Sequence, residues 1–122
     1  MGYNNIDVPE ARKRGVWVTN TPDVLNDATA DMAWALLFAV SRRVAEGDRL
    51  MRSGTFSWQP EFMLGADITG RTLGVVGAGR IGRNFALKSR GFGMKVLYSG
   101  RRPSPEFEAE TGGRFAALDE LL

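Results

Sequence analysis

The glycine-rich segment at residues 77–82, Gly-Ala-Gly-Arg-Ile-Gly, constrains the fold of this chain more than any other feature. A strand is predicted before it at residues 71–76, a helix after it at residues 80–90, and a second strand at residues 94–98. Because 15 of the 122 residues are glycine, the spacing alone is a weak signal, but the order strand, turn, helix, strand is specific. We therefore predict an α/β fold that forms part of a Rossmann-type doubly wound sheet.

Each glycine of this segment has a separate role in such a fold. Gly77 permits a tight turn, Gly79 leaves room for a pyrophosphate group, and Gly82 lets the helix pack closely on the strand. The N–H groups at the start of the helix, near Arg80 and Ile81, would face the phosphates. The segment therefore predicts a dinucleotide-binding site that these five residues form. The alternative is a glycine-rich turn with a purely structural role.

The residues after the second strand bear on which dinucleotide is bound. NAD sites usually place Asp or Glu about 20 residues after the motif, where the carboxylate binds the ribose 2′-hydroxyl. The chain has no carboxylate at residues 94–105 and instead offers Ser99, Arg101 and Arg102. Arginine forks and a small hydroxyl suit an anionic 2′-phosphate. The pattern favours NADP, with NAD as the alternative cofactor, over a loop whose arginines are merely solvated.

The chain contains no histidine and no cysteine. It therefore lacks the most common general acid–base residue and cannot use a thiol, and we expect no metal site. The formal net charge is only +2 and basic residues are interleaved with acidic ones, so nucleic-acid binding is not expected. The longest apolar run, residues 32–40, is far shorter than the ~20 residues that span a bilayer. We expect a cytoplasmic protein that does not contact membranes.

The rest of the chain is predicted to be mainly helical. A short helix is predicted at residues 7–14, a strand at residues 16–19 and a helix start at residues 118–122. A long helix is predicted at residues 28–52, with Asn26 or Asp27 as its cap. Since residues 32–40 are all apolar, we expect that stretch to be buried on all sides.

Residues 53–70 have no clear periodicity and are predicted to form a loop or extended arm. This arm is unusually apolar for a solvated linker, because it carries Phe56, Trp58, Phe62, Met63 and Leu64. The long helix before it has a single apolar stripe in its second half, formed by Leu37, Val40, Val44, Gly47 and Met51. Two interpretations of the stripe remain open, an internal core helix and a subunit interface.

Several segments together resemble the D-isomer-specific 2-hydroxyacid dehydrogenases, namely residues 1–7, 21–25, 28–31 and 73–82. Residues 57–60 and 98–105 are similar to the glyoxylate/hydroxypyruvate reductase branch. The resemblance runs along nearly the whole chain. It implies a central fragment of such an enzyme, in which residues 1–27 are a remnant of the substrate domain, residues 28–70 form the long helix and dimerisation arm, and residues 71–122 begin the dinucleotide-binding domain.

The resemblance also implies roles for individual residues. The backbone of Met1 and Gly2 would help to hold a substrate carboxylate, and Trp58 would reach the neighbouring subunit's active site in a homodimer formed through residues 28–64, from Ala28 to Leu64. The family's catalytic arginine, glutamate and histidine would follow the last residue of this chain, so we expect the chain alone to be inactive. The implied reaction is hydride transfer from NADPH to a small 2-oxo acid such as glyoxylate or hydroxypyruvate. The alternative is a non-enzymatic module for dinucleotide binding or dimerisation.

Overall fold

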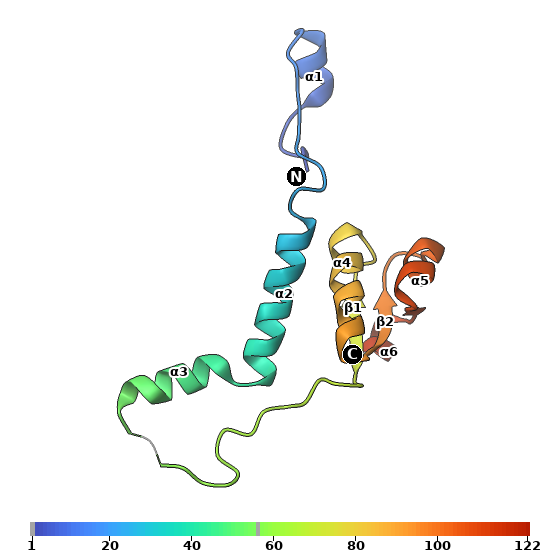
Figure 1. Cartoon of the computed structure of the whole chain (residues 1–122). Helices are drawn as coiled ribbons and strands as arrows, with labels where there is room; N and C mark the ends of the chain where they lie inside the picture. Colours follow the sequence, from blue (N-terminus) through green and yellow to red (C-terminus); the bar gives the residue numbers. More distant parts are fainter. Residues whose placement is uncertain (1, 56) are drawn as a thin grey trace.

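The computed structural model describes residues 2–55 and 57–122 and is built around a three-stranded parallel sheet. The strands are β1 (Thr72–Val76), β2 (Lys95–Ser99) and β3 (Arg114–Phe115), in the order β1-β2-β3. In the strands β1 and β2, which Figure 1 labels, Thr72 pairs with Lys95 and Val76 with Ser99 according to their parallel register. Met1 and Phe56, for which the sequence predicts a substrate contact and a place in the apolar arm, lie outside the described residues.

The unit predicted around the glycine-rich segment is confirmed. Helix α4 (Arg80–Lys88) follows β1 and leads through the 3-10 turn η1 (Ser89–Phe92) into β2. The predicted helix is therefore slightly too long, because its last turn tightens before Gly93, which has a positive φ of 60°. The sequence does not predict β3, which has only two residues and forms because Leu97 and Tyr98 of β2 pair with it. Helices α5 (Pro105–Thr111) and α6 (Leu118–Leu121) complete this half of the chain.

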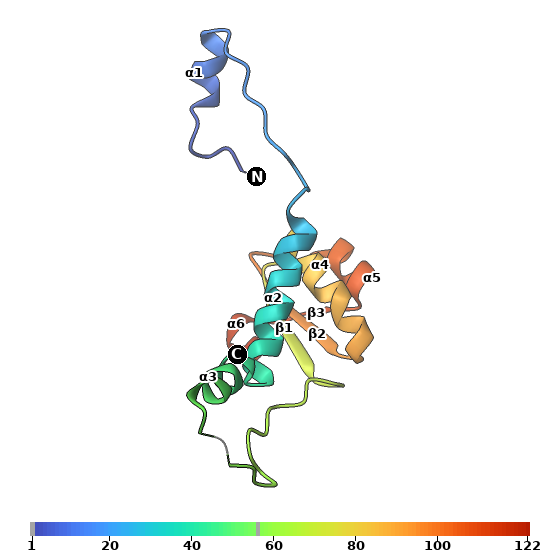
Figure 2. The same cartoon turned by 60° about the vertical axis from the view of Figure 1, so that its left-hand side comes forward.

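The core lies between the sheet and the helices α2 (Asn26–Ser41), α4 and α5. Its buried members come from each of these elements and include Trp34, Leu73, Val75, Ala86, Val96, Tyr98 and Phe107. Trp34 joins two of the helices, because its ring packs 5.0 Å from the Phe85 ring and its Nε1 donates a hydrogen bond to the Phe85 carbonyl at 3.0 Å. Figure 2 shows α2 lying alongside α4 and the sheet. This packing holds α4, which follows the glycine turn, against α2.

The long helix predicted at residues 28–52 is two helices, α2 and α3 (Val44–Ser53). The break falls at Arg43, which adopts a left-handed conformation with φ of 55°. The arm returns to this break: the Ala66 N–H donates to the Ser41 carbonyl at 2.7 Å, and a Cβ on Gly65 would lie 2.4 Å from the same oxygen. A carbonyl at the end of α2 is thus satisfied by the arm instead of by a further helical turn.

The predicted cap of this helix is also wrong. The capping residue is Leu25, and no side chain caps the helix. Asn26 and Asp27 instead lie in the first turn, where the Asn26 amide donates to Asp23 at 2.9 Å and Asp27 accepts from Asn84 of α4 at 3.0 Å. These two side chains therefore join the start of α2 to Asp23 and to α4, and they do not cap the backbone N–H groups of α2.

The expectation that residues 32–40 are buried on all sides is wrong for this chain. Trp34 is buried, but Met32, Leu36 and Val40 have exposed fractions of 60%, 59% and 79%. These three residues are spaced by four and therefore lie on one face of α2, which we call the exposed apolar stripe. A helix whose residues are all apolar can bury one face against its own fold and leave the other face for a partner.

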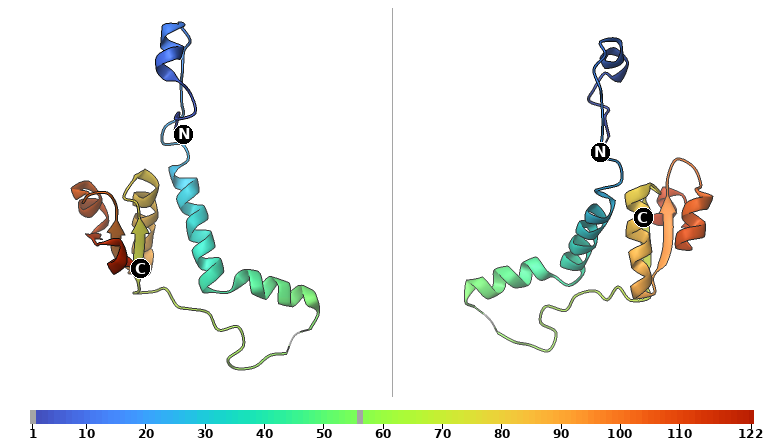
Figure 3. Two further views of the ribbon diagram at one scale, coloured as in Figure 1. Left: turned by 180° about the vertical axis from the view of Figure 1, so that it is seen from behind. Right: turned by 45° about the horizontal axis from the view of Figure 1, so that its top comes forward.

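The N-terminal segment confirms one prediction and corrects another. Helix α1 (Val8–Lys13) forms as expected, with the Asp7 carboxylate accepting a hydrogen bond from the Glu10 N–H at 2.9 Å. No strand forms at residues 16–19, where the chain is extended but pairs with no neighbour, and Trp17 is 93% exposed. Figure 3 shows α1 standing away from the sheet at the end of this segment. No helix within residues 2–55 and 57–122 is long and apolar enough to cross a membrane.

Candidate functional site

The glycine turn joins the end of β1 to the start of α4. Gly77 has a φ of 103°, a conformation that residues with a side chain rarely adopt, and its N–H donates to the Ser99 carbonyl at 2.8 Å. A Cβ on Gly82 would lie 2.0 Å from the Gly77 carbonyl oxygen, so only glycine allows the helix to approach the turn this closely. These contacts give Gly77 and Gly82 the geometry expected of their positions in a dinucleotide-binding turn.

The start of α4 is free of protein capping groups. Gly79 is its N-cap, with an extended backbone and no side-chain hydrogen bond to the first turn. A Cβ on Gly79 would meet no atom within 4 Å, so the space in front of the helix is open. The first N–H groups of a helix are unpaired within the helix and carry a partial positive charge, which suits a phosphate group. The turn can therefore accept the pyrophosphate of a dinucleotide.

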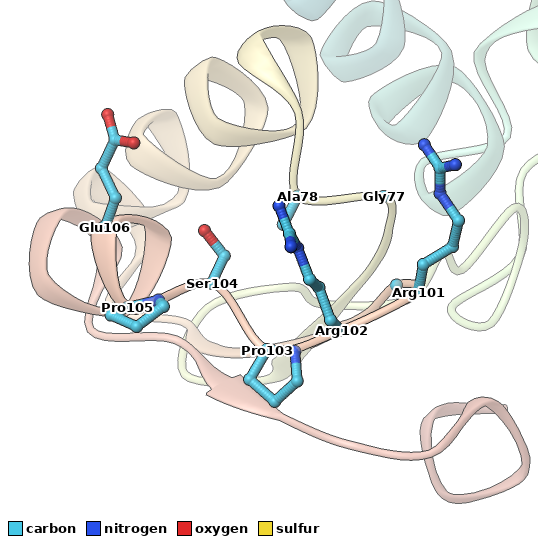
Figure 4. Close-up of a pocket in the computed structure, with 9 residues that line it drawn as sticks. Gly77, Ala78, Arg101, Arg102, Pro103, Ser104, Pro105 and Glu106 are labelled. Carbon is cyan, nitrogen blue, oxygen red and sulfur yellow. The ribbon is translucent and has the colours of Figure 1, made fainter.

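An open hollow of about 920 Å³ lies beside the glycine turn. It is lined by the turn, by the loop after β2 and by the start of α5, through residues Gly77, Ala78, Gly100, Arg101, Arg102, Pro103, Ser104, Pro105 and Glu106. Figure 4 shows Arg101 and Arg102 extending from the loop on the side where Gly77 and Ala78 lie. Two exposed guanidinium groups thus share one hollow with the turn, although they are more than 20 positions away from it in the chain.

The sequence reasoning missed two residues of this hollow that carry polar side chains, Ser104 and Glu106. The Ser104 hydroxyl accepts a hydrogen bond from the Phe107 N–H at 3.4 Å and caps α5. Glu106 is bound by Arg83 of α4 at 2.9 Å, and the same guanidinium contacts Glu110 at 3.0 Å. The pattern Ser-Pro-Glu is a recognisable helix start and could have placed both residues here.

Tyr98 lies directly beneath the loop and is fully buried. Its hydroxyl accepts a hydrogen bond from the Ser104 N–H at 2.7 Å and donates one to the Glu108 carboxylate at 2.7 Å. Burial raises the pKa of the Tyr98 phenol above its ordinary value, and the neighbouring Glu108 carboxylate raises it further. The phenol therefore stays neutral and can donate to Glu108 throughout the physiological range of pH.

The other predicted site residues are distributed around the turn. Gly79, Ile81 and Gly82 line a second hollow of about 470 Å³, which also includes Gly77 and runs along β1. Arg80 is exposed and pairs with Asp23 at 3.2 Å. Ser99 is buried at the end of β2 and does not line the first hollow, to which Ser104 contributes the hydroxyl instead.

The two described residues with a predicted role towards substrate lie elsewhere. Gly2 is exposed in the N-terminal segment, and Trp58 is 71% exposed on the arm that follows α3. Neither lines either hollow beside the glycine turn. Met1 lies outside the described residues. The roles of all three therefore stay predictions.

A parallel sheet with a glycine turn leading into an uncapped helix defines the nucleotide-binding domain of a Rossmann-type protein. Residues 34–122 match the sequence model of the D-isomer specific 2-hydroxyacid dehydrogenase, NAD binding domain. The chain is 54% identical to a glyoxylate reductase of Thermococcus onnurineus and 52% identical to one of Korarchaeum cryptofilum. All of this chain is covered in both comparisons, together with 38% and 37% of those proteins.

Solved structures give the same result. A protein of Thermus thermophilus superimposes with a TM-score of 0.87 at 48% identity, over 99% of this chain and 38% of that one. A D-lactate dehydrogenase of Aquifex aeolicus, solved with NAD and lactic acid, gives a TM-score of 0.78 at 30% identity, over 99% and 36%. The chain belongs to the D-isomer specific 2-hydroxyacid dehydrogenase family and spans about 38% of the length of the curated relatives it matches.

Proposed function

We propose that this chain is the cofactor-binding part of an NADPH-dependent reductase of small 2-oxo acids such as glyoxylate or hydroxypyruvate. The observation that carries the proposal is the shared hollow in which Arg101 and Arg102 lie beside the glycine turn. The turn and the start of α4 would hold the pyrophosphate, and the two guanidinium groups would bind the 2′-phosphate. When bound, NADPH would supply the hydride.

The absence of a free carboxylate in the hollow supports NADP over NAD. Ser99 ends β2 and Gly100 follows it, at the place where NAD sites carry an acid that accepts hydrogen bonds from the ribose hydroxyls. Glu106 is the acid that lines this hollow, and its carboxylate is already bound by Arg83. A 2′-phosphate would therefore meet two cations and a neutralised acid, whereas a 2′-hydroxyl would lack its usual acceptor.

The substrate class is supported by the relatives that are named glyoxylate reductase. Reduction of a 2-oxo acid needs a cation to orient the carboxylate and an acid to protonate the new alkoxide. This chain has no histidine to act as that acid, so we expect no turnover from these 122 residues alone. Met1, Gly2 and Trp58 are proposed to contact the substrate within a complete enzyme, which we expect to be cytoplasmic.

We further propose that the chain forms a homodimer through residues 28–64. The exposed apolar stripe of α2 supports this, and α3 adds Val44 and Met51, with exposed fractions of 57% and 65%. Apolar area of this kind favours association by ~25 cal/mol per Å² that is removed from water. The same stripe favours the second candidate function, in which the chain acts only as a module for dinucleotide binding and dimerisation.

The test compares NADPH and NADH affinities in the wild-type chain and in the double variant Arg101→Ala/Arg102→Ala. Charge-assisted contacts are worth ~1.5–3 kcal/mol when shielded from water, and these side chains are exposed, so we expect a loss nearer tenfold per arginine for NADPH. NADH affinity should change little. The matched control is Arg12→Ala/Arg14→Ala, in the last turn and at the C-cap of α1, which removes the same charge away from the hollow. Equal losses for both cofactors would refute the assignment.

A further inference from the structure

We propose that the Tyr98 hydroxyl is a positioning group that fixes the loop at residues 100–104 and so determines how strongly the chain prefers a 2′-phosphate over a 2′-hydroxyl. We call residues 100–104 the specificity loop. The inference rests on the proposed function, because it assigns to this loop the recognition of the 2′-phosphate. It adds to the two arginines a buried residue that touches no cofactor atom.

The specificity loop is held at both ends by hydrogen bonds to the sheet. Before the loop, the Ser99 carbonyl accepts a hydrogen bond from Gly77, which ties the end of β2 to the glycine turn. After the arginines, the Ser104 N–H donates to the Tyr98 hydroxyl at 2.7 Å. Arg101 and Arg102 therefore lie between two fixed points. At the second point Ser104 also caps α5, where its carbonyl accepts a hydrogen bond from the Glu108 N–H at 3.0 Å, and the Tyr98 hydroxyl joins it to the sheet.

The hydroxyl itself is fixed by its surroundings. The Tyr98 ring packs against Phe107 of α5 at 4.5 Å and Phe115 of β3 at 5.5 Å between ring centroids. The hydroxyl donates its hydrogen to the Glu108 carboxylate, and its oxygen accepts the hydrogen bond from the Ser104 N–H. A phenylalanine would fill the same space between the two rings. The hydroxyl is therefore needed for the connection between β2, α5 and the loop, and not for the packing of the core.

Fixing the loop before the ligand arrives reduces the entropy lost on binding. Long arginine side chains on a free loop would have to be ordered together with their backbone, and that cost would reduce affinity for the 2′-phosphate. Without the hydroxyl, the Ser104 N–H would lose its acceptor, and this end of the loop would be held by the first turn of α5 and no longer by the sheet. The pyrophosphate contacts at Gly77 and α4 would remain, because they do not depend on Ser104.

The experiment measures the affinities of two half-cofactors, adenosine 2′,5′-bisphosphate and adenosine 5′-monophosphate, by titration calorimetry on the 122-residue chain. For Tyr98→Phe, we expect the preference for the bisphosphate to fall roughly three- to tenfold, the loss expected from one buried hydrogen bond. The affinity for the monophosphate should stay within about twofold. The matched control is Tyr3→Phe, which removes the chain's other tyrosine hydroxyl from an exposed position. Amide hydrogen exchange at Ser104 should accelerate in Tyr98→Phe and not in Tyr3→Phe.

A second pair of variants tests the same connection without changing Tyr98. Glu108→Gln keeps an acceptor for the tyrosine hydroxyl and should retain most of the preference. Glu108→Ala removes that acceptor and should lower the preference in the same direction as Tyr98→Phe. This pair keeps the inference testable if Tyr98→Phe does not fold, because Glu108 is only partly buried.

The outcomes separate this inference from the proposed function. If the wild-type chain binds neither probe, or both equally well, the NADPH assignment fails and this inference fails with it. If the wild-type chain prefers the bisphosphate and Tyr98→Phe or Glu108→Ala retains that preference, the NADPH assignment stands and this inference is overturned. If Tyr98→Phe lowers the affinities for the bisphosphate and the monophosphate equally, Tyr98 has a purely structural role, and this inference is also overturned.

Discussion

Alanine substitutions at Gly79 and Gly82 should separate the stability of the fold from the binding of the cofactor. At Gly82 a Cβ would lie 2.0 Å from the Gly77 carbonyl oxygen and 3.2 Å from a methyl group of Val75, which is buried in β1. The start of α4 would have to move away, which typically costs about 1–3 kcal/mol or more. Alanine would regain only ~0.5–1 kcal/mol of helix propensity, so the clash should prevail.

Alanine at Gly79 should leave the stability of the fold nearly unchanged and weaken cofactor binding. Gly79 has a φ of −81°, which alanine adopts readily, and its Cβ would meet no protein atom within 4 Å. The fold should therefore tolerate Gly79→Ala, but the methyl group would occupy the space assigned to the pyrophosphate.

Thermal unfolding and NADPH titration of both variants test this reasoning. We expect the Tm of Gly82→Ala to fall by roughly 5–15 °C, since 1 kcal/mol corresponds to about 4–8 °C in a domain of this size. Gly79→Ala should unfold within a few degrees of wild type and lose NADPH binding by roughly tenfold or more. If Gly79→Ala binds NADPH as well as wild type does, the pyrophosphate does not lie over this turn.

Three further predictions concern association, ionisation and activity. Val44→Asp should convert a dimer into a folded monomer in sedimentation experiments, because Val44 is 57% exposed and an acid is tolerated at the start of α3; an unmodified chain that sediments as a monomer would contradict the dimer. Because the pKa of Tyr98 is raised, its contribution to stability should be complete below pH ~10 and be lost as the pH rises through the raised value, and phenolate absorbance should show a late component that Tyr98→Phe removes. The 122-residue chain should not oxidise NADPH in the presence of glyoxylate or hydroxypyruvate, and turnover that survives repurification would disprove this.

The sequence was sufficient to predict the elements around the glycine turn. The apolar run that becomes β1 and the helix that becomes α4 have strong local patterns. Gly77 has a backbone conformation that favours glycine, and Gly82 has a contact that only glycine permits. The two-residue strand β3 has no such pattern, since it depends on the register of β2. The predicted strand at residues 16–19 failed for the related reason that extended residues become a strand only where a neighbour pairs with them.

The long helix shows where periodicity alone is insufficient. Its apolar pattern continues past residue 41, yet the helix breaks at Arg43, and Ala66 in the distant arm donates a hydrogen bond to the Ser41 carbonyl at the break. Composition also overstated burial at residues 32–40, since an apolar side chain can face a partner as well as a core. Similarly, the Tyr98 connection joins β2, the specificity loop and α5, and no spacing within the sequence indicates it.

Mapping the amides that respond to cofactor in ¹H–¹⁵N spectra tests the central claim most directly. NADPH and NADH are added in turn to the labelled chain. We predict that both shift the amides of Gly77, Gly79 and Gly82, and that NADPH alone strongly shifts the amides of Arg101 and Arg102. Shifts confined to other regions, or an identical response of the specificity loop to both cofactors, would contradict the account.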